Sequence, residues 1–233
     1  MQGEQGRGGH GAAGQFGRRL ADLKRNGCNV LLVGTDALDA GCERLLGESS
    51  AGPRYRLFVT TDAGPASARA RLAGVQSGPY RDSAAVVDWR ADGRAAGEAG
   101  DRESDGRAFR VTSVESDDLG DLSRAVEAAV ESFAAEAGEL SPAELRLCVD
   151  SLAPLVEASD ERTLRRLLLA LIETVERVDG MGHYHLPGGY DSASVATVEA
   201  LFDAVVELRR VESRVEQRWH LLDPDLTTRW LAL

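Results

Sequence analysis

The chain has 233 residues, more than a typical single domain, which predicts one large domain or one domain with appendages. Hydrophobic residues make up 43% of the chain and charged residues 28%, enough to build a core and to exclude disorder over the whole length. The 38 acidic and 27 basic residues give a net charge of −11, whose field would repel phosphates, so we expect no nucleic-acid partner.

The first half of the chain alternates short apolar runs with short helical patterns. Glycines dominate residues 1–16, which predicts a flexible tail followed by a single domain over 17–233. An amphipathic helix is expected from Phe16, because Phe16, Leu20 and Leu23 share one side. Buried strands are expected at 29–34, 55–61, 84–89 and 109–114, helices at 40–46 and 66–72, and a polar, glycine-rich loop at about 90–107.

The second half carries the stronger helical patterns. Leu119, Leu122, Val126 and Val130 recur at steps of three and four and predict a helix over 117–137. Asp160 is a suitable N-cap for a second helix, over 160–178. Further strands are expected at 145–149 and 181–186, a helix at 194–201, and an antiparallel hairpin made of 205–211 and 215–222.

This alternation predicts an α/β fold of three layers, with a mainly parallel sheet flanked by helices and an antiparallel hairpin at its C-terminal end. Ligands of such sheets bind at the carboxyl ends of the strands. The residues that follow each predicted strand are therefore the first candidates for a functional site.

The segment after the first strand, Gly34 to Glu43, does not fit a nucleotide. A phosphate-binding loop has the pattern GxxxxGK[ST], in which backbone amides and a lysine hold the phosphates. Here the interval from Gly34 to Gly41 is too long, and Cys42 and Glu43 take the places of lysine and serine or threonine. Asp36 adds negative charge where a polyphosphate would lie. The dinucleotide pattern GxGxxG is missing as well.

Three segments nevertheless resemble a known family. Residues 57–62, LFVTTD, are similar to the second strand of KaiC-like members of the RecA superfamily. Residues 147–152, LCVDSL, resemble the Walker B strand of that family, and 202–209, FDAVVELR, resemble a later strand. The similarity covers roughly residues 28–222, and the chain also resembles small haloarchaeal KaiC-like proteins, which would suit its composition.

The resemblance implies a RecA-like fold and the places where nucleotide chemistry would reside. Asp62 takes the position of a water-polarising acid, with Ala63 in place of the second acid, and Asp150 takes that of the magnesium-holding aspartate. Gly34, Gly41, Asp62, Asp150 and Ser151 are then vestigial nucleotide-site candidates. With neither lysine nor magnesium hydroxyl, we expect a non-catalytic pseudo-ATPase, without cofactor, that acts as a regulatory or signalling module through a protein partner or self-association.

The alternative is an enzyme that depends on a metal ion or on a nucleotide and uses His183 and His185 or Asp150. The two histidines are two residues apart on a predicted strand, so both side chains lie on one face. His220 or Asp191 could supply a third metal ligand. A structural role as hydrogen-bonded, half-buried histidines is the expectation, with no metal bound.

Other polar groups carry weaker signals. Ser151 lacks the GxSxG setting of a nucleophile. Arginines of the terminal hairpin alternate with glutamates, which favours cross-strand ion pairs over nucleic-acid binding. The apolar C-terminus, residues 228–233, is expected to dock on this domain or on a neighbour.

Cysteine usage and hydropathy suggest where the protein resides. Cys28, Cys42 and Cys148 are far apart and form no CxxC pair, so we expect small buried hydrophobic residues in a reducing compartment, with neither zinc nor disulfides. The apolar run Leu167 to Ile172 is far shorter than the roughly 20 residues of a membrane span. Residues 1–15 have no apolar core of a signal peptide, so the prediction is a soluble, cytoplasmic protein.

Overall fold

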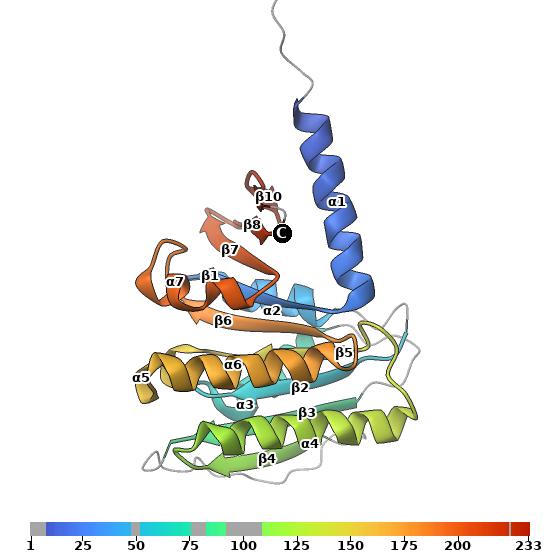
Figure 1. Cartoon of the computed structure of the whole chain (residues 1–233), viewed down its shortest axis with the longest axis vertical. Coiled ribbons are helices and arrows are strands. Elements are labelled where there is room, and N and C mark those ends of the chain that lie inside the picture. The colour runs from blue at the N-terminus through green and yellow to red at the C-terminus, as the bar shows by residue number, and fades with distance from the viewer. Residues whose placement is uncertain (1–7, 48–51, 76–82, 92–108, 224) are drawn as a thin grey trace, which may run out of the picture.

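The computed structural model describes residues 8–47, 52–75, 83–91, 109–223 and 225–233 (Figure 1). Its centre is an open sheet with strand order β10-β8-β7-β1-β6-β5-β2-β3-β4, and β9 pairs with β8. The strands from β7 to β4 in this order pair in parallel, whereas β8, β9 and β10 pair antiparallel. The predicted mainly parallel α/β sheet with a C-terminal antiparallel hairpin is therefore confirmed.

The elements follow the predicted order closely. The strands are β1 (Cys28–Gly34), β2 (Tyr55–Thr60), β3 (Ser83–Arg90), β4 (Phe109–Glu115), β5 (Leu145–Val149), β6 (Met181–Pro187), β7 (Ala204–Val211), β8 (Arg214–Leu222), β9 (Asp225–Thr227) and β10 (Leu231–Ala232). The helices are α1 (Gly8–Asn26), α2 (Leu38–Leu46), α3 (Gly64–Gly74), α4 (Leu119–Ala137), α5 (Ala153–Ala158), α6 (Glu161–Glu176), α7 (Ala193–Val198) and the 3₁₀ turn η1 (Glu199–Leu201).

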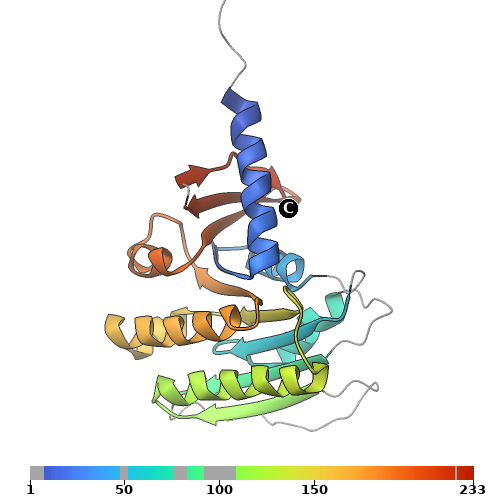
Figure 2. The same ribbon diagram turned by 45° about the vertical axis from the view of Figure 1, so that its right-hand side comes forward.

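Helices cover both faces of the sheet. In Figures 1 and 2, α4 and α6 lie side by side on one face, while α2 and α3 lie behind the sheet. Side chains of successive strand residues point to opposite faces, so Leu57 and Leu147 pack under α4 and α6, whereas Phe58 and Cys148 pack under α2 and α3. Burial on two sides is the reason the central strands read as continuous apolar runs.

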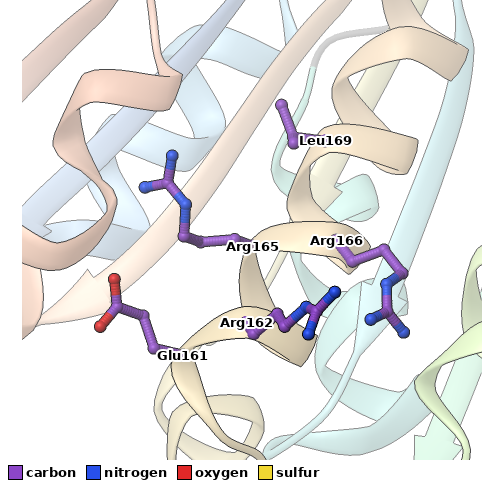
Figure 3. A pocket seen from close by; sticks show the side chains of 5 residues that line it. All are labelled: Glu161, Arg162, Arg165, Arg166 and Leu169. Carbon is purple, nitrogen blue, oxygen red and sulfur yellow. The ribbon is translucent and has the colours of Figure 1, made fainter.

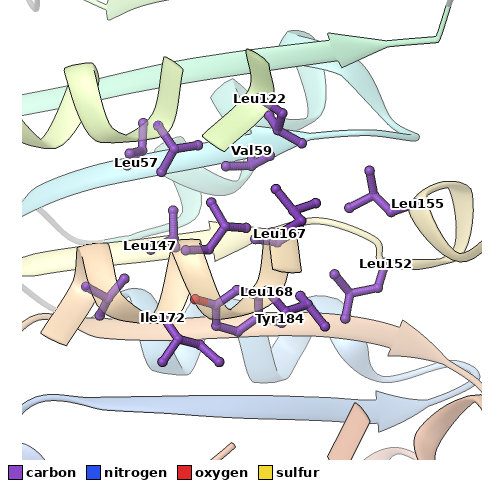
Figure 4. Close-up of a cluster of buried hydrophobic side chains, with 14 of the residues drawn as sticks. Leu57, Val59, Leu122, Leu147, Leu152, Leu155, Leu167, Leu168, Ile172 and Tyr184 are labelled. Carbon is purple, nitrogen blue, oxygen red and sulfur yellow. The ribbon is translucent and has the colours of Figure 1, made fainter. Parts of the chain in front are cut away.

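The larger core lies between the sheet and α4 with α6 (Figure 4). Leu57, Leu147 and Tyr184 of the sheet meet Leu122 of α4 and Leu168 of α6 there. Both helices begin close to the residues where they were predicted to begin. The Asp118 and Asp160 carboxylates cap them by accepting hydrogen bonds from Gly120 N–H and Thr163 N–H. In the described part of the chain, no helix is long and apolar enough to cross a membrane.

At the two ends of the described chain, one expectation differs from the structure and one agrees with it. Within the segment predicted as a tail, residues 8–16 are helical, because α1 starts at Gly8. Ala12 and Ala13 favour a helix, which continues into the anchored segment Phe16 to Leu23. Residues 1–7 and 92–107 of the predicted tail and loop lie outside the described residues. The C-terminus docks on its own domain, where Leu231 and Ala232 pair with β8.

The predicted cross-strand ion pairs of the terminal hairpin are present. Arg209 pairs with Glu216 at 2.7 Å and Arg218 with Glu207 at 2.5 Å. Both guanidinium groups also lie over the ring of Trp230, at 3.8 and 4.7 Å from its centroid. These arginines are therefore occupied by contacts within the domain.

Candidate functional site

Most of the candidate residues for a nucleotide site lie at one end of the sheet, where β1, β2, β5 and β6 end. The strands β5 and β6 are neighbours, and β6 separates β5 from β1. Gly34 is the last residue of β1, and Asp62 and Asp150 follow β2 and β5. The region therefore holds every vestigial nucleotide-site candidate except Gly41, which lies in α2.

The connection between β1 and α2 is a short turn of only three residues, 35–37. Gly34 is fixed at its start, because its carbonyl oxygen accepts a hydrogen bond of 3.0 Å from the Gly188 N–H. Asp36 is exposed in this turn, and Asp39 lies in the first turn of α2. A turn this short and this acidic forms no cradle of amides around a polyphosphate.

Gly34 and Gly41 have a packing role in this structure. A Cβ on Gly34 would lie 2.5 Å from the backbone oxygen of Leu208 in β7, and its φ of +152° is one that other residues rarely adopt. A Cβ on Gly41 would lie 2.4 Å from Cδ1 of the same leucine. Both glycines thus permit the close approach of β1 and α2 to β7.

The Asp150 carboxylate is occupied by the backbone of the turn after β2. Its Oδ1 accepts a 2.8 Å hydrogen bond from Thr61 N–H, and its Oδ2 accepts one of 3.1 Å from Ala63 N–H. The Thr61 hydroxyl lies 3.0 Å from Oδ1. Since only 8% of Asp150 is exposed, this aspartate ties the end of β5 to the end of β2.

Ser151 and Asp62, the neighbouring site candidates, are not arranged for catalysis either. Ser151 is buried, and its hydroxyl oxygen accepts a hydrogen bond of 3.2 Å from Ala153 N–H at the start of α5. Asp62 is exposed at the surface of the turn. The structure therefore brings Asp150, Ser151 and Thr61 together, but as a hydrogen-bonded turn.

A second group of polar side chains lies deeper, between α2 and the sheet. His183 and His185 do project from one face of β6, as their spacing predicted, and their rings lie 5.5 Å apart. Two cysteines complete the group: Cys42 from α2 and Cys148 from β5. The ligand atoms of these four side chains all lie within 4.8 Å of one another; we call the four residues the Cys2His2 cluster.

The cluster is closed to solvent and linked internally. The two sulfur atoms are 3.3 Å apart, His183 Nε2 lies 3.3 Å from Cys42 Sγ, and His185 Nε2 lies 3.9 Å from Cys148 Sγ. All four residues are at most 2% exposed. Buried apolar side chains from Leu46, Phe58 and Val86 pack in the same core layer as the two cysteines.

The surroundings set the protonation of the cluster. The hydrogen bond with Cys148, together with His183 beside it, holds the pKa of the Cys42 thiol well below its ordinary value. Burial and the neighbouring Cys42 hold the pKa of Cys148 well above its ordinary value, and burial lowers the pKa of His183. A thiolate beside a neutral imidazole is the form in which these side chains bind metals.

The other proposed metal ligands lie elsewhere. His220, on β8, stacks on Tyr190 and faces Thr227 and Glu207 at 3.2 and 3.4 Å. Asp191 is exposed and is not among the four clustered ligands. His220 and Asp191, which the alternative hypothesis offered as a possible third ligand, therefore do not lie with His183 and His185. Spacing along the chain did not indicate that Cys42 and Cys148 join the two histidines, because the two cysteines are 106 residues apart in the sequence.

The surface of the described residues includes the following two hollows. The larger, of about 850 Å³, lies between α1, α2 and the sheet, and its walls combine apolar side chains such as Trp219 with charged ones such as Glu43 and Arg44. The smaller, of about 440 Å³, lies on α6 and is lined by Glu161, Arg162, Arg165, Arg166 and Leu169 (Figure 3). We call these five residues the α6 patch; it is cationic on an acidic protein.

Fold and site together define a mainly parallel α/β protein with a closed β1–α2 turn and a buried Cys2His2 cluster. Residues 27–208 match the model of a family of unknown function, DUF7504. The chain therefore belongs to that family, and the matched segment runs from the start of β1 into β7. No curated protein matches the sequence.

Proposed function

We propose that this protein is a non-catalytic, RecA/KaiC-like regulatory or signalling module that acts through protein contacts. The order of the segments that resemble the superfamily supports the fold relationship, since these segments form strands of one parallel sheet. We place the module in the cytoplasm, because a reducing compartment keeps buried thiols such as Cys42 and Cys148 unoxidised.

The observation that carries the proposal is the closed turn from β1 to α2. Phosphoryl transfer depends almost entirely on positioning and on charge stabilisation. The turn of three residues offers no room for backbone amides around the phosphates, and no lysine or arginine occurs from Gly34 to Glu43. Asp150, which would hold magnesium, instead accepts hydrogen bonds from Thr61 and Ala63.

The α6 patch is the surface that we assign to a protein partner. Arg162 and Arg166 are exposed, and Leu169 next to them is 51% exposed although it is a large apolar residue. Cationic groups around an exposed leucine fit an acidic segment that carries an apolar side chain. Arg165 also donates a hydrogen bond to Thr197 O, which fixes one wall of the patch.

Nucleotide binding tests the first half of the proposal. We expect isothermal titration of the purified protein with Mg²⁺ and ATP, in molar KCl, to show no saturable heat up to millimolar nucleotide. Phosphate release should equal that of an Asp150→Asn variant, which retains the shape of the side chain. Hydrolysis that is present in the wild type and lost in Asp150→Asn would contradict the proposal.

Partner binding tests the second half. We expect a protein that co-purifies with the wild type to be lost when Arg162 and Arg166 are changed to glutamate, and to bind again, once purified, only to the wild type. Arg69→Glu, an exposed arginine of α3, is the matched control and should keep the partner. Equal binding by all variants would refute the assignment of the α6 patch.

The alternative enzyme built on His183 and His185 has less support. Catalytic metal sites keep one position open to water or substrate. Here two cysteines take up the remaining positions around the histidines, and the whole cluster is buried. The geometry therefore favours a role of the cluster inside the fold.

A further inference from the structure

The Cys2His2 cluster contains the ligand set of a zinc site. Zinc is held by thiolate sulfur and imidazole nitrogen, and four such ligands in a tetrahedron are characteristic of structural sites. Both histidines direct Nε2 toward a cysteine sulfur of the cluster. The four side chains come from three separate elements, α2, β5 and β6, which the fold brings to one point.

The distances match a tetrahedral ion. Bonds of about 2.3 Å to sulfur and about 2.0–2.1 Å to nitrogen place two ligand sulfurs about 3.8 Å apart, and a sulfur and a nitrogen about 3.5 Å apart. The corresponding distances here are 3.3 Å between the sulfurs and 3.3 and 3.9 Å from sulfur to nitrogen. For these three pairs an ion requires shifts of a few tenths of an ångström, and all four ligand atoms lie within 4.8 Å of one another.

The charges match as well. Two thiolates and two neutral imidazoles around a divalent ion sum to zero, so the complex can lie in an apolar layer without an unpaired charge. Without an ion, two imidazoles and two thiols in the same layer have weak sulfur hydrogen bonds as their partners, one of them at 3.9 Å. Coordination to an ion would compensate the free-energy cost of burying these four polar side chains more fully than the sulfur hydrogen bonds do.

The position of Cys42 gives the site a mechanical role. Helix α2 has nine residues and no side-chain N-cap, and isolated helices of that length are unstable. Arg56 and Arg146 hold its C-terminal end by donating hydrogen bonds to Gly47 O and Leu45 O. A bond from Cys42 would fix the middle of the helix to the centre of the sheet.

We propose that Cys42, Cys148, His183 and His185 bind one zinc ion in a closed structural site that fastens α2 to β5 and β6. The site holds no open position for substrate, so the ion acts on the stability of the fold. The proposal is independent of the proposed function, because the partner would bind the α6 patch at the surface, whereas the ion would lie in the buried Cys2His2 cluster.

Metal content is the first test. The protein is purified without a histidine tag and analysed by plasma mass spectrometry; we expect about one zinc per chain. Cys42→Ser and His183→Gln should lose the zinc. Cys28→Ser and His220→Gln are matched controls, because both residues are buried and lie outside the cluster, and both variants should keep it.

Cobalt replacement keeps the test decisive if the ligand variants do not fold. Apo wild type, prepared with a chelator, is titrated with Co²⁺ alone, and tetrahedral thiolate coordination should give an intense sulfur-to-metal charge-transfer band and strong visible bands at one equivalent. The Cys28→Ser protein should give the same spectrum. A spectrum of six-coordinate Co²⁺ without charge transfer would overturn the proposal, as would a Cys42–Cys148 disulfide in the freshly isolated wild type.

Thermal unfolding and amide hydrogen exchange test whether the ion stabilises the fold by fastening α2. Removal of zinc should lower the thermal unfolding midpoint by on the order of 10 °C, and returned zinc should restore it. Amide hydrogen exchange of α2 should accelerate more on removal than that of α6, which the cluster does not touch. Exchange that is unchanged in α2, in a protein that binds zinc, would refute the fastening role.

Discussion

At the scale of single residues, neighbours decide what chemically identical side chains do. The three cysteines are all buried. Cys42 and Cys148 face two histidines, whereas Cys28, at the start of β1, packs with Leu23 and Val30 under α1. Their common burial was predictable from composition, and it is confirmed. Their division into a pair and a single residue depends on the fold.

The pH dependence of stability should reveal the Cys28 environment. Burial, aided by Asp203, raises the pKa of the Cys28 thiol from 9.0 to about 12. Above pH 9 the thiol ionises in the unfolded chain but stays neutral in the folded one, so the folded state loses stability as pH rises toward 12. The loss approaches about 1.4 kcal/mol per pH unit.

Urea unfolding at pH 8, 9 and 10 measures this effect. The free energy of unfolding should fall more steeply in the wild type than in Cys28→Ala, which has no thiol at this position. The difference between the two proteins cancels contributions from the other cysteines and from tyrosines. Parallel curves would show that Cys28 ionises in the folded protein as readily as in the unfolded chain.

The candidate site was predictable only where the pattern is local. Two histidines at i and i+2 on a strand must share a face, and they do. Cys42 reaches His183 across 141 residues of sequence, and no spacing rule relates the two. The one local signal was the strand Met181 to Leu186 itself, whose histidines are unusual in the buried centre of a parallel sheet.

At the scale of elements, periodicity located the long helices and the central strands because burial imposes it. Helix α6 presents Leu164, Leu168 and Leu171 to the sheet, and α4 presents Leu122 and Val126. The elements that were missed are short: α5 has six residues, and β9 and β10 have three and two. Segments this short carry fewer than two full repeats of either pattern, so tertiary pairing defines them.

The packing of α2 on β7 gives a prediction at this scale. Gly41→Ala places a Cβ 2.4 Å from the Leu208 side chain, and such overpacking costs about 1–3 kcal/mol of unfolding free energy. Leu208→Ala removes the atom concerned, so the double variant should lose less stability than the sum of the single variants. Chemical unfolding of the four proteins in this cycle gives the coupling energy.

Gly34→Ala is the matched control for this cycle. Its Cβ would meet the backbone oxygen of Leu208, which Leu208→Ala leaves in place, and the φ of +152° adds strain. Gly34→Ala should therefore destabilise the protein with or without the leucine side chain. Relief of both glycine substitutions by Leu208→Ala would show that the whole strand moves rather than one side chain.

At the scale of the whole molecule, the net charge follows from the composition alone and does not depend on the fold. The 38 acidic groups exceed the 27 basic ones, so every basic group can find a partner and 11 acids are left over. Among the described ion pairs, Arg177 with Glu127 is largely exposed, whereas Arg218 with Glu207 is partly buried. Each exposed pair contributes about 1 kcal/mol or less.

Salt therefore has two opposing effects, and their magnitudes decide the outcome. Screening weakens the few exposed pairs, but it also weakens repulsion among the unpaired acids over the whole surface, since the screening length falls from about 10 Å at 0.1 M to about 3 Å at 1 M. The second effect involves more charge, so the thermal unfolding midpoint should rise between 0.1 and 2 M KCl. Sucrose at equal osmolality separates screening from solvent exclusion.

A charge variant makes this prediction specific. Glu131, Glu157 and Asp191 are exposed, and lysine at all three positions changes the net charge from −11 to −5. The variant should unfold at a higher temperature than the wild type in 0.1 M KCl and gain less from added salt, because less repulsion is left to screen. An equal gain in both proteins would mean that the salt acts on burial of apolar surface, and that the acidic surface does not limit stability.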